Sequence, residues 1–165
     1  MSGENLSQGM LQVYTGEGKE RTACAWGLAL RAIGQGFKVY IIQFMRGWET
    51  GEAQRVVSRL APEMTLHYFG RPGLVNLRAP APAELTRLRE AWDLARRIIA
   101  AGDHDLVILD EINLVLTHHL LPLEEVLEAL RHRPPWVEVV LTGRDAPQEL
   151  LDLADLVTEM RPLKH

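Results

Sequence analysis

The sequence lacks the features that mark several classes of protein. It has one cysteine, Cys24, so an intrachain disulfide is impossible and a reducing cytoplasm is the expected setting. The first residues lack the apolar core of a signal peptide, and no apolar run approaches the roughly 20 residues that span a bilayer. The formal net charge of -4 leaves no basic excess. We therefore expect neither a membrane nor a nucleic-acid partner.

What the sequence has is the balance of an ordinary folded protein, with 47% hydrophobic and 24% charged residues among 165. A chain of this length can bury one sizeable core, so we expect residues 1–165 to form a single domain. The runs Lys38–Phe44 (KVYIIQF) and Asp105–Leu109 (DLVIL) are typical of strands buried on both faces of a parallel sheet. Ala83–Ala101 is an amphipathic helix with one apolar stripe, which consists of Leu85, Leu88, Trp92, Ala95 and Ile99.

Strands and helices alternate along the rest of the chain as well. Further strands are expected at Met10–Tyr14, Thr65–Phe69, Val137–Leu141 and Leu156–Met160, and further helices at Thr22–Ile33, Glu52–Leu60, Leu123–Arg131 and Pro147–Leu153. The alternation predicts a three-layer α/β/α fold with a mostly parallel sheet, whose ligands bind at the carboxyl ends of the strands. Three apolar or aromatic side chains, Cys24, Trp26 and Trp92, are expected in the core. Trp48, in the loop after the second strand, is a ligand candidate.

A glycine-containing turn, Thr15–Thr22 (TGEGKERT), follows the first expected strand and precedes the first expected helix. Backbone N–H groups in such a turn and at the helix N-terminus favour an anion such as phosphate. The usual phosphate-loop pattern, G-x-x-x-x-G-K-[ST], matches only at Thr22, since Glu20 replaces the second glycine and Arg21 the lysine. The position predicts a phosphate site, and a glycine turn without a ligand is the alternative.

Glu20 and Arg21 change the chemistry of this turn. A carboxylate at a helix N-terminus is favourable by roughly 0.3–1 kcal/mol, but it stands where the phosphate charge would arrive. We therefore expect Glu20 to occupy part of the anion site. Arg21 keeps a positive charge, although its planar guanidinium is bulkier than the ammonium of lysine.

The acidic pair Asp110-Glu111 follows the strand at Asp105–Leu109. Carboxylates at the end of such a strand hold or orient Mg²⁺, usually through water. The alternative is that Asp110 caps a helix that begins at Ile112.

Arg144 follows the next strand along the chain. An arginine at a strand's carboxyl end can bind a phosphate with two parallel hydrogen bonds. The alternative, about equally favoured, is a surface arginine that pairs with Asp145 or Glu149.

Several segments in order resemble the corrinoid adenosyltransferases, the ATP:cob(I)alamin enzymes of the phosphate-loop class. They are TGEGKERTACAWGLALRAIGQGFKV, YIIQFMRG, LVILDEINLVL, LLPLEEVLEALRHRP, VVLTGRDAP and LADLVTEMRPLKH. The likeness extends from about Leu11 to His165 and is weakest between Trp48 and Glu84. It implies a P-loop NTPase-like (RecA-like) fold and transfer of the 5′-deoxyadenosyl group of ATP to a Co(I) corrinoid, with release of triphosphate. It also implies a homodimer.

The resemblance also implies roles for particular residues. The nucleotide would be surrounded by the turn and by one further arginine, namely Gly16, Glu17, Gly18, Lys19, Glu20, Arg21, Thr22 and Arg144. Mg²⁺ would be served by Thr22, Asp110 and Glu111.

The sequence departs from the family pattern in three places. The family turn reads TGNGKGKTT, so Glu20, Arg21 and Ala23 are substitutions. The segment Gly70–Leu77 (GRPGLVNL) lacks the Phe and Trp of the family's corrinoid-facing loop, which help to remove the lower cobalt ligand. The family also often continues beyond the Lys-His pair that ends this sequence. Two hypotheses follow: an adenosyltransferase of cobalamin biosynthesis or salvage, or a catalytically impaired relative that binds a corrinoid, an anion or a protein partner.

Overall fold

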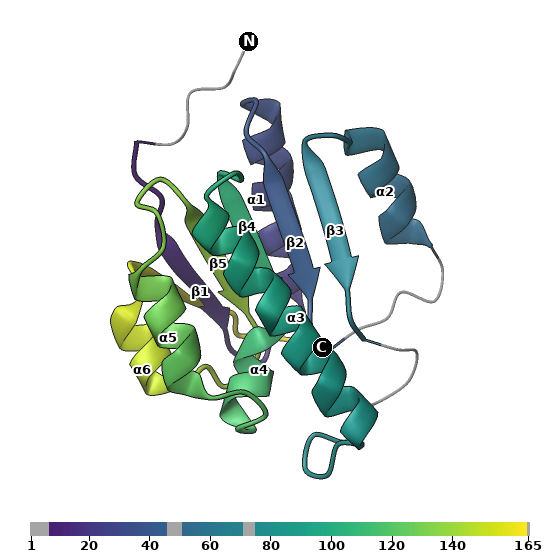
Figure 1. The fold of residues 1–165 in the computed structure, drawn as a ribbon, viewed down its shortest axis with the longest axis vertical. Coiled ribbons are helices and arrows are strands. Elements are labelled where there is room, and N and C mark those ends of the chain that lie inside the picture. The colour runs from purple at the N-terminus through teal and green to yellow at the C-terminus, as the bar shows by residue number, and fades with distance from the viewer. Residues whose placement is uncertain (1–6, 46–50, 71–74, 165) are drawn as a thin grey trace.

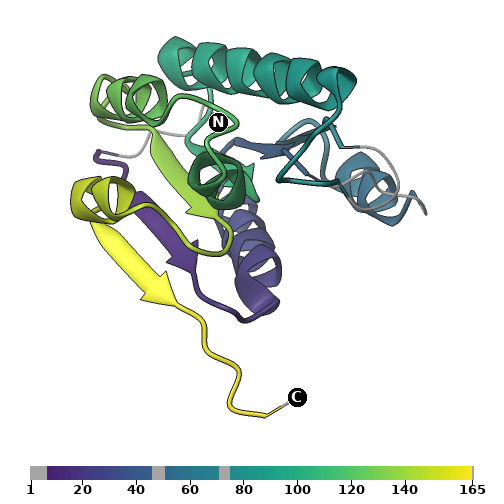
Figure 2. The same ribbon diagram turned by 90° about the horizontal axis from the view of Figure 1, so that it is seen from below.

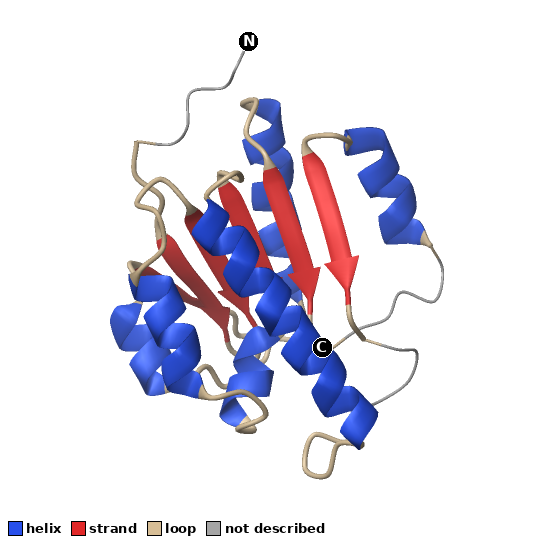
Figure 3. Ribbon diagram, viewed as in Figure 1, coloured by secondary structure: helices blue, strands red, loops and turns tan. Residues whose placement is uncertain are grey.

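Six parallel strands form one sheet within residues 7–45, 51–70 and 75–164, which the computed structural model describes. Their order across the sheet is β3-β2-β4-β5-β1-β6 (Figure 1). The strands are β1 (Leu11–Thr15), β2 (Val39–Gln43), β3 (Met64–Tyr68), β4 (Leu106–Asp110), β5 (Glu138–Thr142) and β6 (Leu156–Glu159). Their arrowheads all point toward one edge of the sheet, where the carboxyl ends of the strands meet (Figure 3).

Helices cover both faces of the sheet, so the predicted three-layer α/β/α fold is confirmed (Figure 2). One face packs against α1 (Glu20–Gly34) and α2 (Glu52–Leu60). The other packs against α3 (Pro82–Ala101), α4 (Ile112–Thr117), α5 (Leu123–Arg131) and α6 (Gln148–Leu153). None of the helices in the described ranges is long and apolar enough to cross a membrane.

The central strand β4 shows why its sequence is almost continuously apolar. Its five residues are all buried. Because successive side chains of a strand point to opposite faces, Val107 and Leu109 join the core under α3 to α6, whereas Leu106 and Ile108 join the core under α1 and α2. Only the last residue, Asp110, is charged, and it lies at the carboxyl-end edge.

Helix α1 packs on the sheet through a face of small residues. Ala25 and Ala29 are fully buried, and Arg21 is buried in the first turn. The larger Leu30 is 58% exposed, and the prediction that Cys24 lies in the core is wrong, because its side chain is exposed. Alanine side chains are short enough to let a helix approach a sheet closely, so Ala25 and Ala29 form the buried centre of this contact, and bulkier residues such as Leu28 and Ile33 pack beside them and are only partly buried.

Helix α3 follows its predicted apolar stripe with one exception. Trp92, Ala95 and Ile99 are almost completely buried, as expected, but Leu85 is 41% exposed. Leu85 lies in the first turn of the helix, which extends beyond the strands and has less sheet beneath it (Figure 1). Trp26 of α1 is only partly buried.

Candidate functional site

The carboxyl ends of three neighbouring strands bring the predicted site segments together. Strand β5 lies between β4 and β1, so the Thr142 strand end is flanked by the acidic pair on one side and by the glycine turn on the other. The turn occupies residues 16–19, directly between β1 and α1. This arrangement puts the candidate phosphate and metal segments on one edge of the sheet.

Asp110 is the centre of a buried hydrogen-bond network. Its side chain is 2% exposed. Its Oδ1 accepts hydrogen bonds from the hydroxyls of Thr22 (2.9 Å) and Thr142 (2.6 Å), and its Oδ2 accepts one from Nε2 of Gln43 (3.0 Å). The alternative that Asp110 caps α4 is wrong, because the N-cap residue of that helix is Glu111 and no side chain caps it. The carboxylate is instead fixed in orientation by donors from α1, β5 and β2.

Glu111 has a left-handed backbone conformation, with φ at 65°, which residues other than glycine rarely adopt. Its N–H donates to the Thr142 hydroxyl over 3.0 Å. Its carboxylate lies 3.7 Å from Nη2 of Arg21 and is about one-fifth exposed. The left-handed residue therefore turns the second carboxylate of the pair toward the glycine turn.

Arg21 reaches back into the glycine turn. Its Nη1 donates to the backbone carbonyls of Gly16 and Gly18, and the residue is 4% exposed. A guanidinium stays charged at any physiological pH, so its burial requires acceptors, which the two carbonyls provide for Nη1 and Glu111 for Nη2. The side chain in the lysine position thus binds the turn itself.

The turn is supported from outside by the segment that follows β6. Gly18 donates its N–H to the carbonyl of Met160 over 2.8 Å. Gly16 has φ at 93°, and a Cβ there would lie 2.5 Å from the same carbonyl, so only glycine fits. The Glu20 carboxylate lies close to the turn: a Cβ atom added to Gly18 would be 2.7 Å from its Oε2.

Arg144 pairs with the turn, since its Nη1 lies 3.5 Å from the carboxylate of Glu17. This contact replaces the pairing with Asp145 or Glu149 that the sequence suggested as an alternative. Both side chains are largely exposed, so the ion pair adds little stability. It does place the Arg144 side chain beside the turn. A second cation, the exposed N-cap residue Lys19 of α1, belongs to the turn itself.

The oxygen groups around Asp110 fit a magnesium site of the kind that substrate phosphates complete. Among the described residues there is no group of three or more His, Cys, Asp or Glu side chains that could hold a metal ion. Mg²⁺ is usually bound by one or two carboxylates together with substrate phosphates and water, rather than by a full protein cage. The hard oxygen donors of Thr22, Asp110 and Glu111 meet this requirement.

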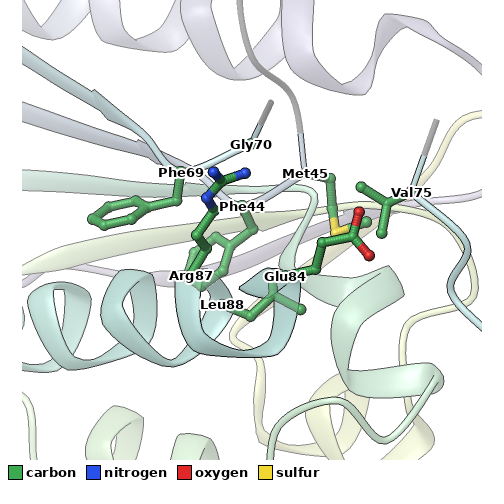
Figure 4. Close-up of a pocket in the computed structure, with 8 residues that line it drawn as sticks. All are labelled: Phe44, Met45, Phe69, Gly70, Val75, Glu84, Arg87 and Leu88. Carbon is green, nitrogen blue, oxygen red and sulfur yellow. The ribbon is translucent and has the colours of Figure 1, made fainter. Parts of the chain in front are cut away.

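A small apolar pocket opens at the same edge, beyond the acidic pair, where β2 and β3 end (Figure 4). The room that it encloses is about 20 Å³, and it is lined by Phe44, Met45, Phe69, Gly70, Val75, Glu84, Arg87 and Leu88. The pocket is joined to the acidic pair through the backbone, because the Phe44 N–H donates to the Asp110 carbonyl over 3.1 Å. Trp48 and residues 71–74 of the Gly70–Leu77 segment lie outside the described residues.

Several residues of this site did not stand out in the sequence. Gln43 and Thr142 are polar residues at the last position of their strands, directly after the apolar runs YII and VVL, and this position is a signal that could have identified them. Phe44 and Phe69 come directly after strands in the same way. Met160 makes its hydrogen bonds to Thr15 and Gly18 through the backbone, so no side-chain pattern could have indicated them.

Comparison with known proteins gives consistent matches. The model of the ATP:corrinoid adenosyltransferase family BtuR/CobO/CobP matches residues 7–165. The corrinoid adenosyltransferase of Escherichia coli K12 is 38% identical over 159 residues, which cover 96% of this chain and 79% of that protein. The corrinoid adenosyltransferase CobA of Salmonella typhimurium is 36% identical, with the same coverage. That of Pseudomonas aeruginosa is 35% identical over 96% of this chain and 77% of its own.

Solved structures of low sequence identity share the fold. The flagellar accessory protein FlaH of Methanocaldococcus jannaschii has a TM-score of 0.60 at 10% identity, over 93% of this chain and 72% of that one. A KaiC-like protein of Pyrococcus horikoshii has a TM-score of 0.58 at 12% identity, over 96% and 76%. These likenesses concern the fold alone, and they agree with the predicted three-layer α/β/α architecture.

Proposed function

The chain belongs to the ATP:corrinoid adenosyltransferase family, and on this basis we propose that it transfers the 5′-deoxyadenosyl group of ATP to the Co(I) centre of a corrinoid, in cobalamin biosynthesis or salvage. One observation carries the proposal. The carboxyl-end edge of the sheet has a polar half, at β1, β5 and β4, beside an apolar half, at β2 and β3. The polar half suits a magnesium–triphosphate group, and the apolar half suits part of a corrinoid.

In the polar half, the turn Gly16–Thr22 and Arg144 would bind the triphosphate. Arg21 would exchange the carbonyls of Gly16 and Gly18 for phosphate oxygens, since a guanidinium binds phosphate with two parallel hydrogen bonds. Mg²⁺ would be held by Thr22 and by Asp110 and Glu111, directly or through water, and would offset the charge of the triphosphate.

The reaction is a displacement at the ribose C5′. The electron pair of Co(I) forms the cobalt–carbon bond, the C5′–O bond breaks, and triphosphate leaves with that bonding pair. The charge that develops on the leaving oxygen lies over the turn, where Lys19 and Arg21 and the helix N-terminus stabilise it. The protein also has to place C5′ in line with cobalt and keep water away from Co(I).

The test is a reaction of the purified protein with MgATP and Co(I)alamin under strict exclusion of oxygen. The expected result is the absorption spectrum of the cobalt–carbon product together with one equivalent of triphosphate. A folded protein that yields neither would refute the proposed activity.

The alternative is a catalytically impaired relative, and the turn itself favours it. The Glu20 carboxylate lies against Gly18, and Arg21 already binds the turn carbonyls, so both substitutions act where phosphate would bind. Under this alternative, isothermal titration with MgATP shows no micromolar binding, and the double substitution Glu20→Gly with Arg21→Lys restores it. Micromolar binding by the unmodified chain would decide for the first proposal.

We further propose that the protein acts as a cytoplasmic homodimer of single-domain chains and binds small molecules rather than nucleic acid. Sedimentation velocity measures the dimer directly, and a sedimentation coefficient of a monomer at micromolar concentration would contradict it.

A further inference from the structure

Arg87 lines the apolar pocket and has a buried donor without an acceptor. It lies in the second turn of α3, and its Nη1 is inaccessible to solvent and has no hydrogen-bond partner. In Figure 4 its guanidinium extends from the helix toward Phe69 and Gly70, while the carboxylate of Glu84 lies on the other side of the pocket, toward Met45 and Val75.

Arg89, two residues further along α3, is an arginine whose guanidinium has hydrogen-bond acceptors. Arg89 forms two hydrogen bonds with the carboxylate of Glu125, at 2.9 and 2.8 Å. Arg87 has the same chemistry, but apolar side chains such as Phe44 and Leu88 surround its end of the pocket. A buried polar group without a partner is costly and calls for an explanation, such as a bound water, an ion or a functional role.

The size and lining of the pocket indicate which group it would accept. A cavity needs about 10–15 Å³ of enclosed room to hold one water molecule, so about 20 Å³ accepts the end of a side group of a larger ligand rather than its body. The walls are mainly apolar, and Arg87 offers a charged hydrogen-bond donor. The carboxylate of Glu84 is already used, since Oε2 accepts the N–H of Ala81 over 2.8 Å. The pocket therefore suits the acceptor-oxygen end of an aliphatic arm whose stem lies outside it.

We propose that Arg87 is a specificity-determining residue that donates a hydrogen bond to an acceptor oxygen on a peripheral arm of the corrinoid. This inference rests on the proposed function. Corrinoids carry aliphatic arms that end in amide carbonyls, and complete corrinoids also carry a phosphodiester in the lower nucleotide arm. Either oxygen matches the donor. The end of the arm would lie in the pocket while the ring extends along the edge toward Asp110, whose carbonyl already contacts Phe44.

The experiment measures corrinoid binding without turnover. Equilibrium dialysis of the full chain with stable Co(III) corrinoids, cobalamin and cobinamide, compares wild type with Arg87→Gln. The matched control is Arg96→Gln, on the same helix but 52% exposed and paired with Asp93. Loss of one hydrogen bond from a charged donor is expected to weaken binding about tenfold in Arg87→Gln, with no change in the control. Arg87→Lys, which keeps the charge, should recover part of the affinity.

The two corrinoids distinguish the sources of the acceptor. An equal loss for cobalamin and cobinamide identifies an amide carbonyl, and a loss for cobalamin alone identifies the phosphodiester, which cobinamide lacks. MgATP affinity and the thermal midpoint should stay at the wild-type values, because Nη1 of Arg87 has no partner within the protein. If Arg87→Gln binds both corrinoids with wild-type affinity, the role of Arg87 is refuted but the proposed function is not. A wild-type protein that binds neither corrinoid would overturn the proposed function as well.

Discussion

Substitution of Thr142 by valine tests whether the strand-end network holds the acidic pair. Thr142 is fully buried, and valine has almost the same shape, so the change removes only the hydroxyl. That hydroxyl donates to Oδ1 of Asp110 over 2.6 Å and accepts the N–H of Glu111 over 3.0 Å. The lost hydrogen bond to a carboxylate costs about 1.5–3 kcal/mol, and the N–H left without an acceptor costs about 1–3 kcal/mol.

The free energy of unfolding should therefore fall by about 3 kcal/mol in Thr142→Val. For a chain of this size each kcal/mol changes Tm by roughly 2–4 °C, so Tm should fall by about 6–12 °C. Urea denaturation and calorimetry measure both quantities. The control is Thr158→Val in the exposed strand β6, for which we expect a change within about 0.5 kcal/mol. If Thr142→Val is as stable as this control, the network does not carry the energy assigned to it.

Two further predictions concern the turn and the contact between α3 and α5. Gly16→Ala should destabilise the fold by about 2 kcal/mol or more, because φ at this position is positive and the added Cβ would meet the Met160 carbonyl. Gly27→Ala should stabilise the fold by about 0.5–1 kcal/mol, because this mid-helix position has open space around it. Circular dichroism melts of both variants check that the two changes have opposite signs. The hydrogen bonds from Arg89 hold the pKa of Glu125 below its ordinary 4.5, so the stability that this carboxylate contributes is present above pH 4.5 and is lost as pH falls through the lower folded value. Urea midpoints between pH 6 and 3 should fall less steeply in Glu125→Gln than in wild type, and parallel curves would contradict this assignment.

The sheet could be predicted from the sequence because its central strands are buried on both faces. DLVIL and KVYIIQF are apolar in both side-chain directions, and this pattern survives in the structure as strands β4 and β2. The sequence does not indicate the short helix α4 as a separate element, and a helix that begins at Ile112 enters only as the alternative role of Asp110. Helix α4 has six residues and follows a left-handed residue, which no periodicity in the sequence indicates.

The site was predictable at the level of segments but not at the level of contacts. Strand ends in a parallel sheet meet at one edge, so the turn, the acidic pair and Arg144 could be expected there. Which way each side chain turns depends on tertiary packing. Pairing of Arg144 with Glu17 joins segments more than 120 residues apart, and the Met160 carbonyl reaches the turn only because β6 lies beside β1.

The substitution of lysine by Arg21 is explained best when it is considered together with Glu111. A lysine ammonium is a single point of donation, whereas a guanidinium has donors on separate nitrogens. Arg21 uses this difference, since Nη1 binds the carbonyls of Gly16 and Gly18 while Nη2 approaches Glu111 at 3.7 Å. One side chain thereby links the turn after β1 to the acidic pair after β4, across the strand between them. Any phosphate that takes Nη1 away from the turn must also alter the charge balance at Glu111. Under the proposed function, phosphate binding and the proposed metal ligands would therefore be coupled through Arg21.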